Sequence, residues 1–140
     1  MADNAALRDA AIANVFERNP FVQLLGIGLQ ERTMSEVTLR MPFRPVLCNT
    51  AGVHHGGAIG SFIDTAGAVA VWNTHDFTKG KRMATLAMTT QYVGVAPGKD
   101  LLASARCTKR GRGVAFVHVL VVDTEGVLIA DALGTYRLSD

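Results

Sequence analysis

Residues 49 to 73, NTAGVHHGGAIGSFIDTAGAVAVWN, predict a polar turn that leads into one long apolar helix. Glycine costs roughly 1 kcal/mol relative to alanine inside a helix, so glycines kept here indicate close approach rather than helix propensity. One carboxylate, Asp64, lies in the middle of the apolar run. A buried acid must be paired, protonated or functional, so Asp64 is the first candidate for chemistry. The glycines of the predicted helix are Gly56, Gly57, Gly60 and Gly67.

Both faces of this helix lack solvating charge when the residues are placed at 100° intervals. One face is large and apolar, and its spacing is typical of a helix packed on a core. The other face is made of small residues, and we expect it to meet a second layer, with another subunit as the candidate. The large face contains Ile59, Phe62, Ile63, Ala66, Val69 and Ala70, and the small face contains Gly57, Gly60, Ser61, Asp64, Gly67, Ala68 and Val71.

Composition favours one domain spanning residues 1–140, because the chain is 49% hydrophobic and shows no boundary. A net charge of +2 gives no case for nucleic acid. The two cysteines, Cys48 and Cys107, form no CxxC pair, which suits a reducing compartment. The N-terminal segment lacks the apolar core of a signal peptide, and no run reaches the ~20 apolar residues of a membrane helix. We therefore expect a cytoplasmic protein that binds neither nucleic acid nor membrane.

The order of the chain predicts an α+β fold in which a curved antiparallel sheet of about six strands wraps the central helix. An amphipathic helix spans residues 4–18, and residues 21–25 could add one turn. Period-two alternation then predicts a hairpin before the central helix and four strands after it. Short glycine-bearing turns between the runs indicate antiparallel pairing. The predicted strands are 27–31, 37–41, 84–93, 101–108, 114–122 and 127–138, with a polar loop at 74–82.

The strand after the central helix alternates in a way that assigns its side chains to two sides. Leu86, Met88 and Tyr92 fall on one side. Thr85 falls on the other side, together with Thr89 and Gln91. The alternation therefore separates Thr85 from Met88 and Tyr92.

The first turn of the central helix is a candidate oxyanion hole. Its backbone N–H groups lack intrahelical partners, the helix dipole is positive there, and Gly56 has no side chain to block approach. Asp64 lies eight residues after Gly56, about 12 Å along the helix axis. A base or nucleophile must come within about 3 to 3.5 Å of its target. If both act on one carbonyl, they come from different subunits, and the protein is at least a dimer. The alternative is that the glycines only let the chain turn into a helix.

The pattern NxxGxxHGG at residues 49–57, followed by Asp64, resembles the signature of the PaaI-like acyl-CoA thioesterases of the hotdog fold. The resemblance extends from about residue 22 to residue 138. It implies active sites at a dimer interface and hydrolysis of coenzyme A thioesters. It also implies a homotetramer made of two dimers, and no cofactor, because coenzyme A is part of the substrate.

The resemblance also implies roles for individual residues. Asp64 would be the nucleophile or the general base, and the Gly56 N–H of the opposite subunit would polarise the thioester carbonyl. His55 would orient or assist this carbonyl-binding turn. Asn49 would hold the loop or contact the thioester, and Thr85 would position the acid or its water. Asn49 and Thr85 each also have a purely structural interpretation.

Substrate binding would involve Gly57 and one basic hairpin turn. Coenzyme A carries phosphates, so Lys109, Arg110 and Arg112 are candidates for binding its nucleotide end, unless they form a solvated turn. A second basic cluster lies at residues 79–82. The acyl group would lie between subunits against Phe21, Leu25, Phe62 and Trp72 or their neighbours.

Other classes of site find little support. His54, His55 and Cys48 lack the spacing of metal ligands, and we assign His54 a structural role. The glycines match neither a Walker loop nor a Rossmann fingerprint, and there is no GxSxG elbow. The alternative function is a non-catalytic hotdog protein that binds or senses acyl-CoA. Asp64 argues against it, because binding alone would not need that acid.

Overall fold

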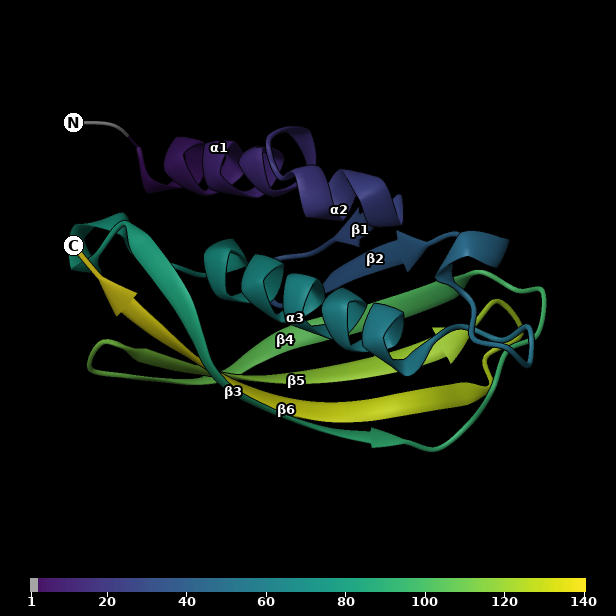
Figure 1. Cartoon of the computed structure of the whole chain (residues 1–140). Coiled ribbons are helices and arrows are strands. Elements are labelled where there is room, and N and C mark those ends of the chain that lie inside the picture. Colours follow the sequence, from purple (N-terminus) through teal and green to yellow (C-terminus); the bar gives the residue numbers. More distant parts are fainter. Residues whose placement is uncertain (1–2) are drawn as a thin grey trace.

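The computed structural model describes residues 3–140 and places the long helix α3 (Gly56–Asn73) against a single curved sheet (Figure 1). The strand order is β1-β2-β4-β5-β6-β3, and each neighbouring pair is antiparallel. The predicted α+β fold, with six strands around one helix, is confirmed. The strands are β1 (Gly28–Arg32), β2 (Val37–Met41), β3 (Arg82–Tyr92), β4 (Leu101–Gly111), β5 (Val114–Asp123) and β6 (Leu128–Ser139).

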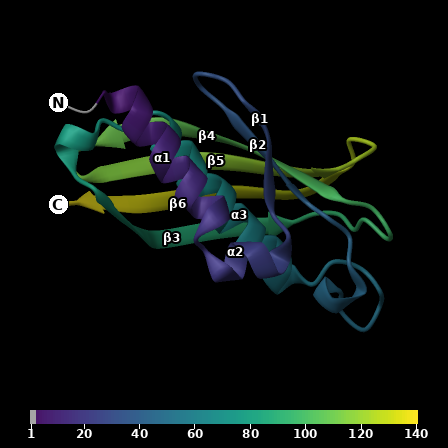
Figure 2. The same ribbon diagram turned by 90° about the horizontal axis from the view of Figure 1, so that it is seen from above.

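Two N-terminal helices lie over α3 on the side away from the sheet (Figures 1 and 2). The helix α1 (Asn4–Glu17) buries Ile12, and α2 (Pro20–Leu25) buries Val22 and Leu25. The side chain of Asn19 caps α2, and Gly26 ends it with a φ of 72°. A left-handed residue of this kind is a common helix stop, and glycine adopts it without a steric penalty. Both predicted N-terminal helical segments are therefore confirmed.

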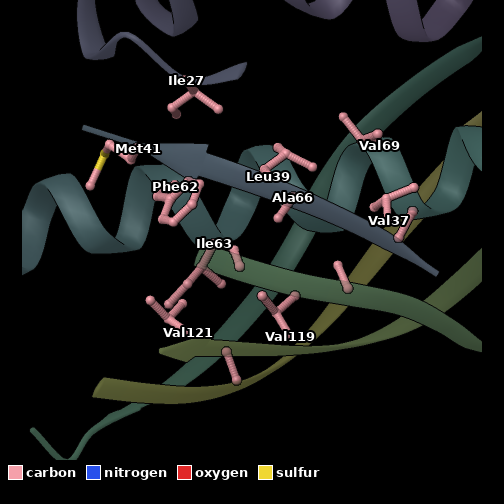
Figure 3. Packing of buried hydrophobic residues seen from close by; sticks show 14 of the residues in the cluster. Ile27, Val37, Leu39, Met41, Phe62, Ile63, Ala66, Val69, Val119 and Val121 are labelled. Atoms are coloured by element: carbon pink, nitrogen blue, oxygen red, sulfur yellow. The ribbon is translucent and has the colours of Figure 1, made fainter. Parts of the chain in front are cut away.

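The core lies between α3 and the concave face of the sheet. The whole large apolar face of α3 is buried, as its spacing predicts. Figure 3 shows Phe62, Ile63 and Ala66 of α3 among the buried side chains of β2 and β5. Fully burying a side chain of this size contributes about 1.5 to 3 kcal/mol. The large face thus fixes which side of α3 the sheet covers.

We expected the small face of α3 to meet a second layer, with another subunit as the candidate. Much of this face instead packs against this chain's own sheet. A Cβ on Gly60 would lie 3.2 Å from the hydroxyl of Tyr92. A Cβ on Gly67 would lie 3.0 Å from Cζ of Tyr136 and closer still to its hydroxyl oxygen. These two glycines therefore make room for tyrosines of β3 and β6. Other residues of the small face stay partly or fully exposed, namely Gly57, Ser61, Asp64 and Ala68.

A register shift in β3 corrects the predicted sides of that strand. Thr85 lies opposite Tyr136 of β6, and the pairing shifts between Thr85 and Ala87. Thr85 consequently faces α3, on the same side as Met88 and Tyr92 rather than opposite them. A β-bulge adds one unpaired residue, which reverses the alternation beyond it.

Other boundaries also differ from the prediction. Two short 3-10 helices occur outside the predicted elements, η1 (Pro45–Leu47) before α3 and η2 (Phe77–Lys79) within the predicted loop at 74–82. The strand β4 continues to Gly111, so Lys109 and Arg110 lie on a strand rather than in a turn. These two basic residues are therefore held by sheet pairing, whereas Arg112 lies in the connection to β5.

Candidate active site

His55 is the N-cap of α3, and its side chain organises the first turn. The ring Nδ1 accepts a hydrogen bond from the Gly57 N–H at 2.7 Å. In the neutral ring the proton is then on Nε2, which remains on the exposed side chain. A Cβ on Gly57 would lie only 2.9 Å from Nδ1, so a larger residue at 57 would disturb the cap. The His55 side chain therefore fixes the first turn of α3.

The backbone donors of this turn are not equivalent. The N–H of Gly57 is used by His55, so Gly57 does not offer a free donor to a substrate. The Gly56 N–H donates no hydrogen bond to any of the described residues. The Gly56 carbonyl accepts from the Tyr92 hydroxyl at 3.1 Å, which further fixes the turn. Gly56 thus keeps an open N–H at the positive end of the helix dipole.

Asn49 closes the loop that leads into α3. Its Oδ1 accepts from the N–H groups of Ala51 at 3.0 Å and of Val53 at 3.4 Å. Gly52 turns this loop with a φ of 76°. Of the two predicted roles, holding the loop is the one for which the structure provides contacts.

His54, next to the cap, is buried and packs edge-on against Phe43 at 5.4 Å between ring centroids. Its Nε2 lies 2.8 Å from the carbonyl oxygen of Lys99, so this nitrogen carries the proton and donates. These contacts agree with the structural role that the sequence suggested.

Asp64 lies on the partly exposed side of α3, and two hydroxyl groups hold its carboxylate. Oδ1 accepts from Thr85 Oγ1 at 2.8 Å and from the Tyr136 hydroxyl at 3.0 Å. The Tyr136 hydroxyl is also 2.9 Å from the Asp64 backbone oxygen. Burial, together with the adjacent carboxylate, raises the pKa of Tyr136 far above its usual value, so the phenol keeps its proton as a donor. The structure thus brings the predicted residue Thr85 to Asp64.

Tyr136 is the residue near Asp64 that the sequence argument missed. It is 1% exposed and lies on the inward side of β6. A signal was present in the alternation of β6, where Tyr136 follows the small inward residues Ala132 and Gly134. The alternation alone could not identify its partner, because Asp64 is 72 residues away along the chain.

Gly56 and Asp64 are separated along one helix and do not form one site within a single chain. Both belong to α3, whose rise of 1.5 Å per residue puts them about 12 Å apart along the axis. The open N–H and the held carboxylate therefore lie too far apart to contact one small group within a single chain.

Among the basic residues predicted to bind the substrate, one side chain is held by hydrogen bonds and the other two are exposed. The Arg110 guanidinium donates to the Val71 carbonyl oxygen and to Thr74 Oγ1, the latter at 2.7 Å, and burial lowers its pKa. Lys109 and Arg112 are exposed. Arg110 and Arg112 line a cavity of about 850 Å³ at the carboxyl end of α3, together with Lys79. The cavity unites members of both predicted basic clusters.

A small apolar pocket lies beside the first turn of α3. Its volume is about 220 Å³, and it is lined partly by Phe21 and Leu25, two of the predicted acyl contacts, together with His55 and Gly57. Phe62 is fully buried in the core. Trp72 stacks on Phe77 at the other end of α3, with ring centroids 5.2 Å apart. These last two residues therefore do not line this pocket.

Residues 3–140 contain neither a cluster of metal ligands nor a helix suited to a membrane. No three His, Cys, Asp or Glu side chains lie together in a way that could hold a metal ion. No helix in this part of the chain combines the length and apolarity needed to cross a membrane.

Comparison with known proteins assigns the family. The family model of the thioesterase superfamily matches residues 51–130, which is more than half of the chain. A Halobacterium salinarum protein named "Putative esterase" is 30% identical over 98% of this chain and 94% of its own length. The chain belongs to the thioesterase superfamily.

Solved structures agree on the fold. The E. coli PaaI protein from the phenylacetic acid degradation operon aligns with a TM-score of 0.86 at 19% identity, covering 99% of this chain and 97% of PaaI. The Haemophilus influenzae thioesterase HI1161 aligns with a TM-score of 0.83 at 20% identity, over 91% of this chain and 88% of that protein. This chain has the hotdog fold of these proteins, and the predicted resemblance is confirmed.

Proposed function

We propose that this protein is an acyl-CoA thioesterase, in which Asp64 is the nucleophile or the general base. The observation that carries the proposal is the Asp64 carboxylate, held by two hydroxyl donors on a helix that is otherwise nearly free of charge. Membership of the thioesterase superfamily supports hydrolysis as the reaction. The acyl-CoA substrate and the residue roles are our proposal.

The chemistry needs few groups, because a thioester is an activated acyl donor with a good leaving group. In one route, an Asp64 oxygen attacks the carbonyl carbon and the coenzyme A thiolate leaves, giving a mixed anhydride that water then hydrolyses. In the other route, Asp64 takes a proton from water as the water attacks, and the tetrahedral intermediate expels the thiolate. Both routes end in a free acid and coenzyme A. The Gly56 N–H would stabilise the oxyanion in either case.

A second copy of the chain would complete the site. The carboxylate and the open N–H are about 12 Å apart along α3, whereas reacting groups must lie within about 3 to 3.5 Å. The strand β3 ends the sheet, so one of its edges is unpaired within this chain and could pair with a second copy. The partly exposed residues of α3 beside Asp64 would lie in the same interface. We therefore propose a homodimer with two shared sites, and two such dimers forming a homotetramer.

The cavity at the carboxyl end of α3 is our candidate for the coenzyme A phosphates. Lys79, Arg110 and Arg112 supply positive charge to its lining. Thr74 at the end of α3 lies ten residues after Asp64, about 15 Å along the axis. Coenzyme A carries its phosphates at the far end of a long arm from the thioester, so a separation of this order is required. Lys109 is exposed on the same strand as Arg110 and could contribute from outside the cavity.

The test is release of free thiol from acyl-CoA esters of two to sixteen carbons and from aryl-acetyl-CoA, with wild type beside Asp64→Asn. This substitution keeps the size of the side chain and removes its charge, so turnover should vanish while acyl-CoA binding persists. Asp9→Asn, on the exposed surface of α1, is the matched control and should keep wild-type turnover. Asp64→Asn with the wild-type rate would overturn the role of Asp64. Saturable binding by wild type without turnover would indicate a protein that binds or senses acyl-CoA.

Mixed dimers test the sharing of the site. Asp64→Asn and Gly56→Val chains are each expected to be inactive alone. In a mixed dimer, one of the two sites would combine an intact Asp64 with an intact Gly56 from the partner. Recovered activity would support donation across the interface, and no recovery with subunit exchange demonstrated would count against it.

A further inference from the structure

Tyr136 is a buried polar group that the proposed reaction does not use directly. We propose that Tyr136 is a positioning residue that fixes the Asp64 carboxylate, so that Oδ1 is held and Oδ2 is the oxygen that reacts. This inference rests on the proposed function of Asp64. It goes beyond that function by assigning the two carboxylate oxygens different tasks.

The hydrogen bonds around Asp64 are concentrated on one oxygen. Oδ1 accepts from Thr85 at 2.8 Å and from Tyr136 at 3.0 Å. No other described residue donates to the carboxylate, so Oδ2 accepts no hydrogen bond from the described part of the chain. Two donors from different strands prevent the carboxylate from rotating freely. They leave Oδ2 as the oxygen available to a carbonyl carbon or a water.

The two donors are placed by the sheet as a pair. Thr85 and Tyr136 are directly opposite each other in the register of β3 and β6. The bulge after Thr85 keeps Thr85 on the helix side of β3. Because both side chains start from one cross-strand pair, their hydroxyls converge on the same atom of α3.

The helix is shaped to admit the phenol. A Cβ at residue 67 would lie 3.0 Å from Cζ of Tyr136, 3.2 Å from Cε2 and closest to the hydroxyl oxygen. Only glycine at this position leaves the hydroxyl room to reach Asp64. Gly67 is buried in the middle of α3, where helix propensity would favour alanine. The structure thus offers a separate reason why glycine stands at position 67.

A tyrosine that served only to fill the core would need no hydroxyl at this place. Burying a hydroxyl is unfavourable unless it is hydrogen-bonded, and phenylalanine would fill nearly the same volume. The Tyr136 hydroxyl also lies 2.9 Å from the Asp64 backbone oxygen, so a merely structural tie between sheet and helix is the competing interpretation. The two interpretations differ in what happens to kcat when the fold is intact.

The experiment compares Tyr136→Phe with wild type and Asp64→Asn in the thiol-release assay, with circular dichroism and Tm recorded for each. We expect kcat to fall about 10- to 100-fold, because small misplacement of a reacting group has effects of this size. KM should stay within about twofold, because the phenol does not contact the substrate. Thr135→Val is the matched control, since Thr135 is the preceding residue of β6 and faces the other side of the sheet. It should leave kcat unchanged.

Gly67→Ala gives a second measurement that leaves both Tyr136 and Asp64 in place. The added methyl group should displace the hydroxyl and lower kcat in the same way. Gly67→Ala should lower kcat and Tm less in the Tyr136→Phe background than in wild type, because the closest clash is with the hydroxyl that phenylalanine lacks. If Tyr136→Phe alone does not fold, Gly67→Ala still tests the proposal, because it keeps both the Tyr136 hydroxyl and Asp64.

The outcomes distinguish a failure of the proposed role of Tyr136 from a failure of the proposed function. If Asp64→Asn abolishes turnover but folded Tyr136→Phe keeps kcat within twofold of wild type, the role of Tyr136 is overturned and the proposed function stands. A kcat loss that disappears when the assay is run well below the variant's Tm also overturns it, because the effect is then one of stability. If Asp64→Asn is fully active, the proposed function itself fails.

Discussion

The two ends of α3 differ in how completely the fold satisfies their polar groups. At the amino end, the Gly56 N–H has no acceptor among the described residues, and His55 is exposed. At the carboxyl end, Arg110 donates to the Val71 carbonyl oxygen, and the buried His75 donates from Nε2 to the Gly80 carbonyl oxygen at 2.7 Å. The amino end thus presents an unused donor, whereas hydrogen bonds at the carboxyl end hold the helix in place, so we call them the open end and the closed end. Substitutions at the two ends should therefore affect different properties.

The closed end gains further support from α1. Arg8 of α1 donates to the His75 carbonyl oxygen at 2.7 Å, and Trp72 stacks on Phe77 of η2. These contacts join α1, α3 and η2 at one corner of the molecule.

Among changes at the two ends of α3, Gly56→Ala should have the largest effect, and that effect should be on activity. The new methyl group would lie 3.8 Å from the nearest atom of Tyr92, so the fold accommodates it. It would lie beside the open N–H, and loss of one oxyanion donor lowers kcat by about 10² to 10³. Thiol release measures the loss, and Gly28→Ala on β1, with open space around its Cβ, is the control. Wild-type kcat in folded Gly56→Ala would remove Gly56 from the site.

Arg110→Met should be the largest effect at the closed end, and it should be on stability. The substitution leaves Thr74 Oγ1 and His75 Nδ1 without the Arg110 donor, and it leaves the Val71 carbonyl with only the Thr74 N–H at 3.4 Å. We expect a loss of about 2 to 4 kcal/mol in the free energy of unfolding, measured by urea denaturation. Arg112→Met, on the exposed turn, should change it by less than about 0.5 kcal/mol. Equal losses in the two variants would contradict the distinction between a held and an exposed arginine.

His55→Ala should have a smaller effect, and it should lower both stability and activity. Loss of the N-cap bond to Gly57 should cost about 1 kcal/mol in urea unfolding, and kcat should fall because the turn is no longer fixed. His55→Asn can still cap the helix and should recover most of the stability. If asparagine fails to recover stability, the cap is not the source of the loss.

Lowering the pH should reduce the free energy of unfolding through His75 at the closed end. This should be the smallest of the four effects. Burial, with Arg110 nearby, lowers the pKa of His75. The unfolded chain therefore takes up a proton near pH 6.5 before the folded chain does, so stability present above that pH is lost as the pH falls through the folded pKa. Urea unfolding at pH 7.5 and 5.5 should show a larger decrease for wild type than for His75→Gln. Equal decreases would mean that His75 does not carry the effect.

The sequence determined those features that depend on local pattern. The spacing of Phe62, Ile63 and Ala66 was enough to identify the buried face of α3, because a helix repeats every 3.6 residues. An acid inside that helix was enough to single out Asp64, and glycine-bearing turns were enough to predict the antiparallel hairpins. The family pattern around His55 then led to the hotdog fold.

Only the tertiary structure decided which residues surround Asp64. Three features depend on how β3 pairs with β6. They are the bulge beside Thr85, the position of Tyr136 next to Asp64, and the contact of the Tyr136 ring with Gly67. The same holds for Arg110, which the sequence grouped with exposed basic residues and the fold tied to α3. Periodicity describes neighbours along the chain, whereas Tyr136 meets Asp64 across 72 residues. Such contacts arise from strand register, which no single segment specifies by itself.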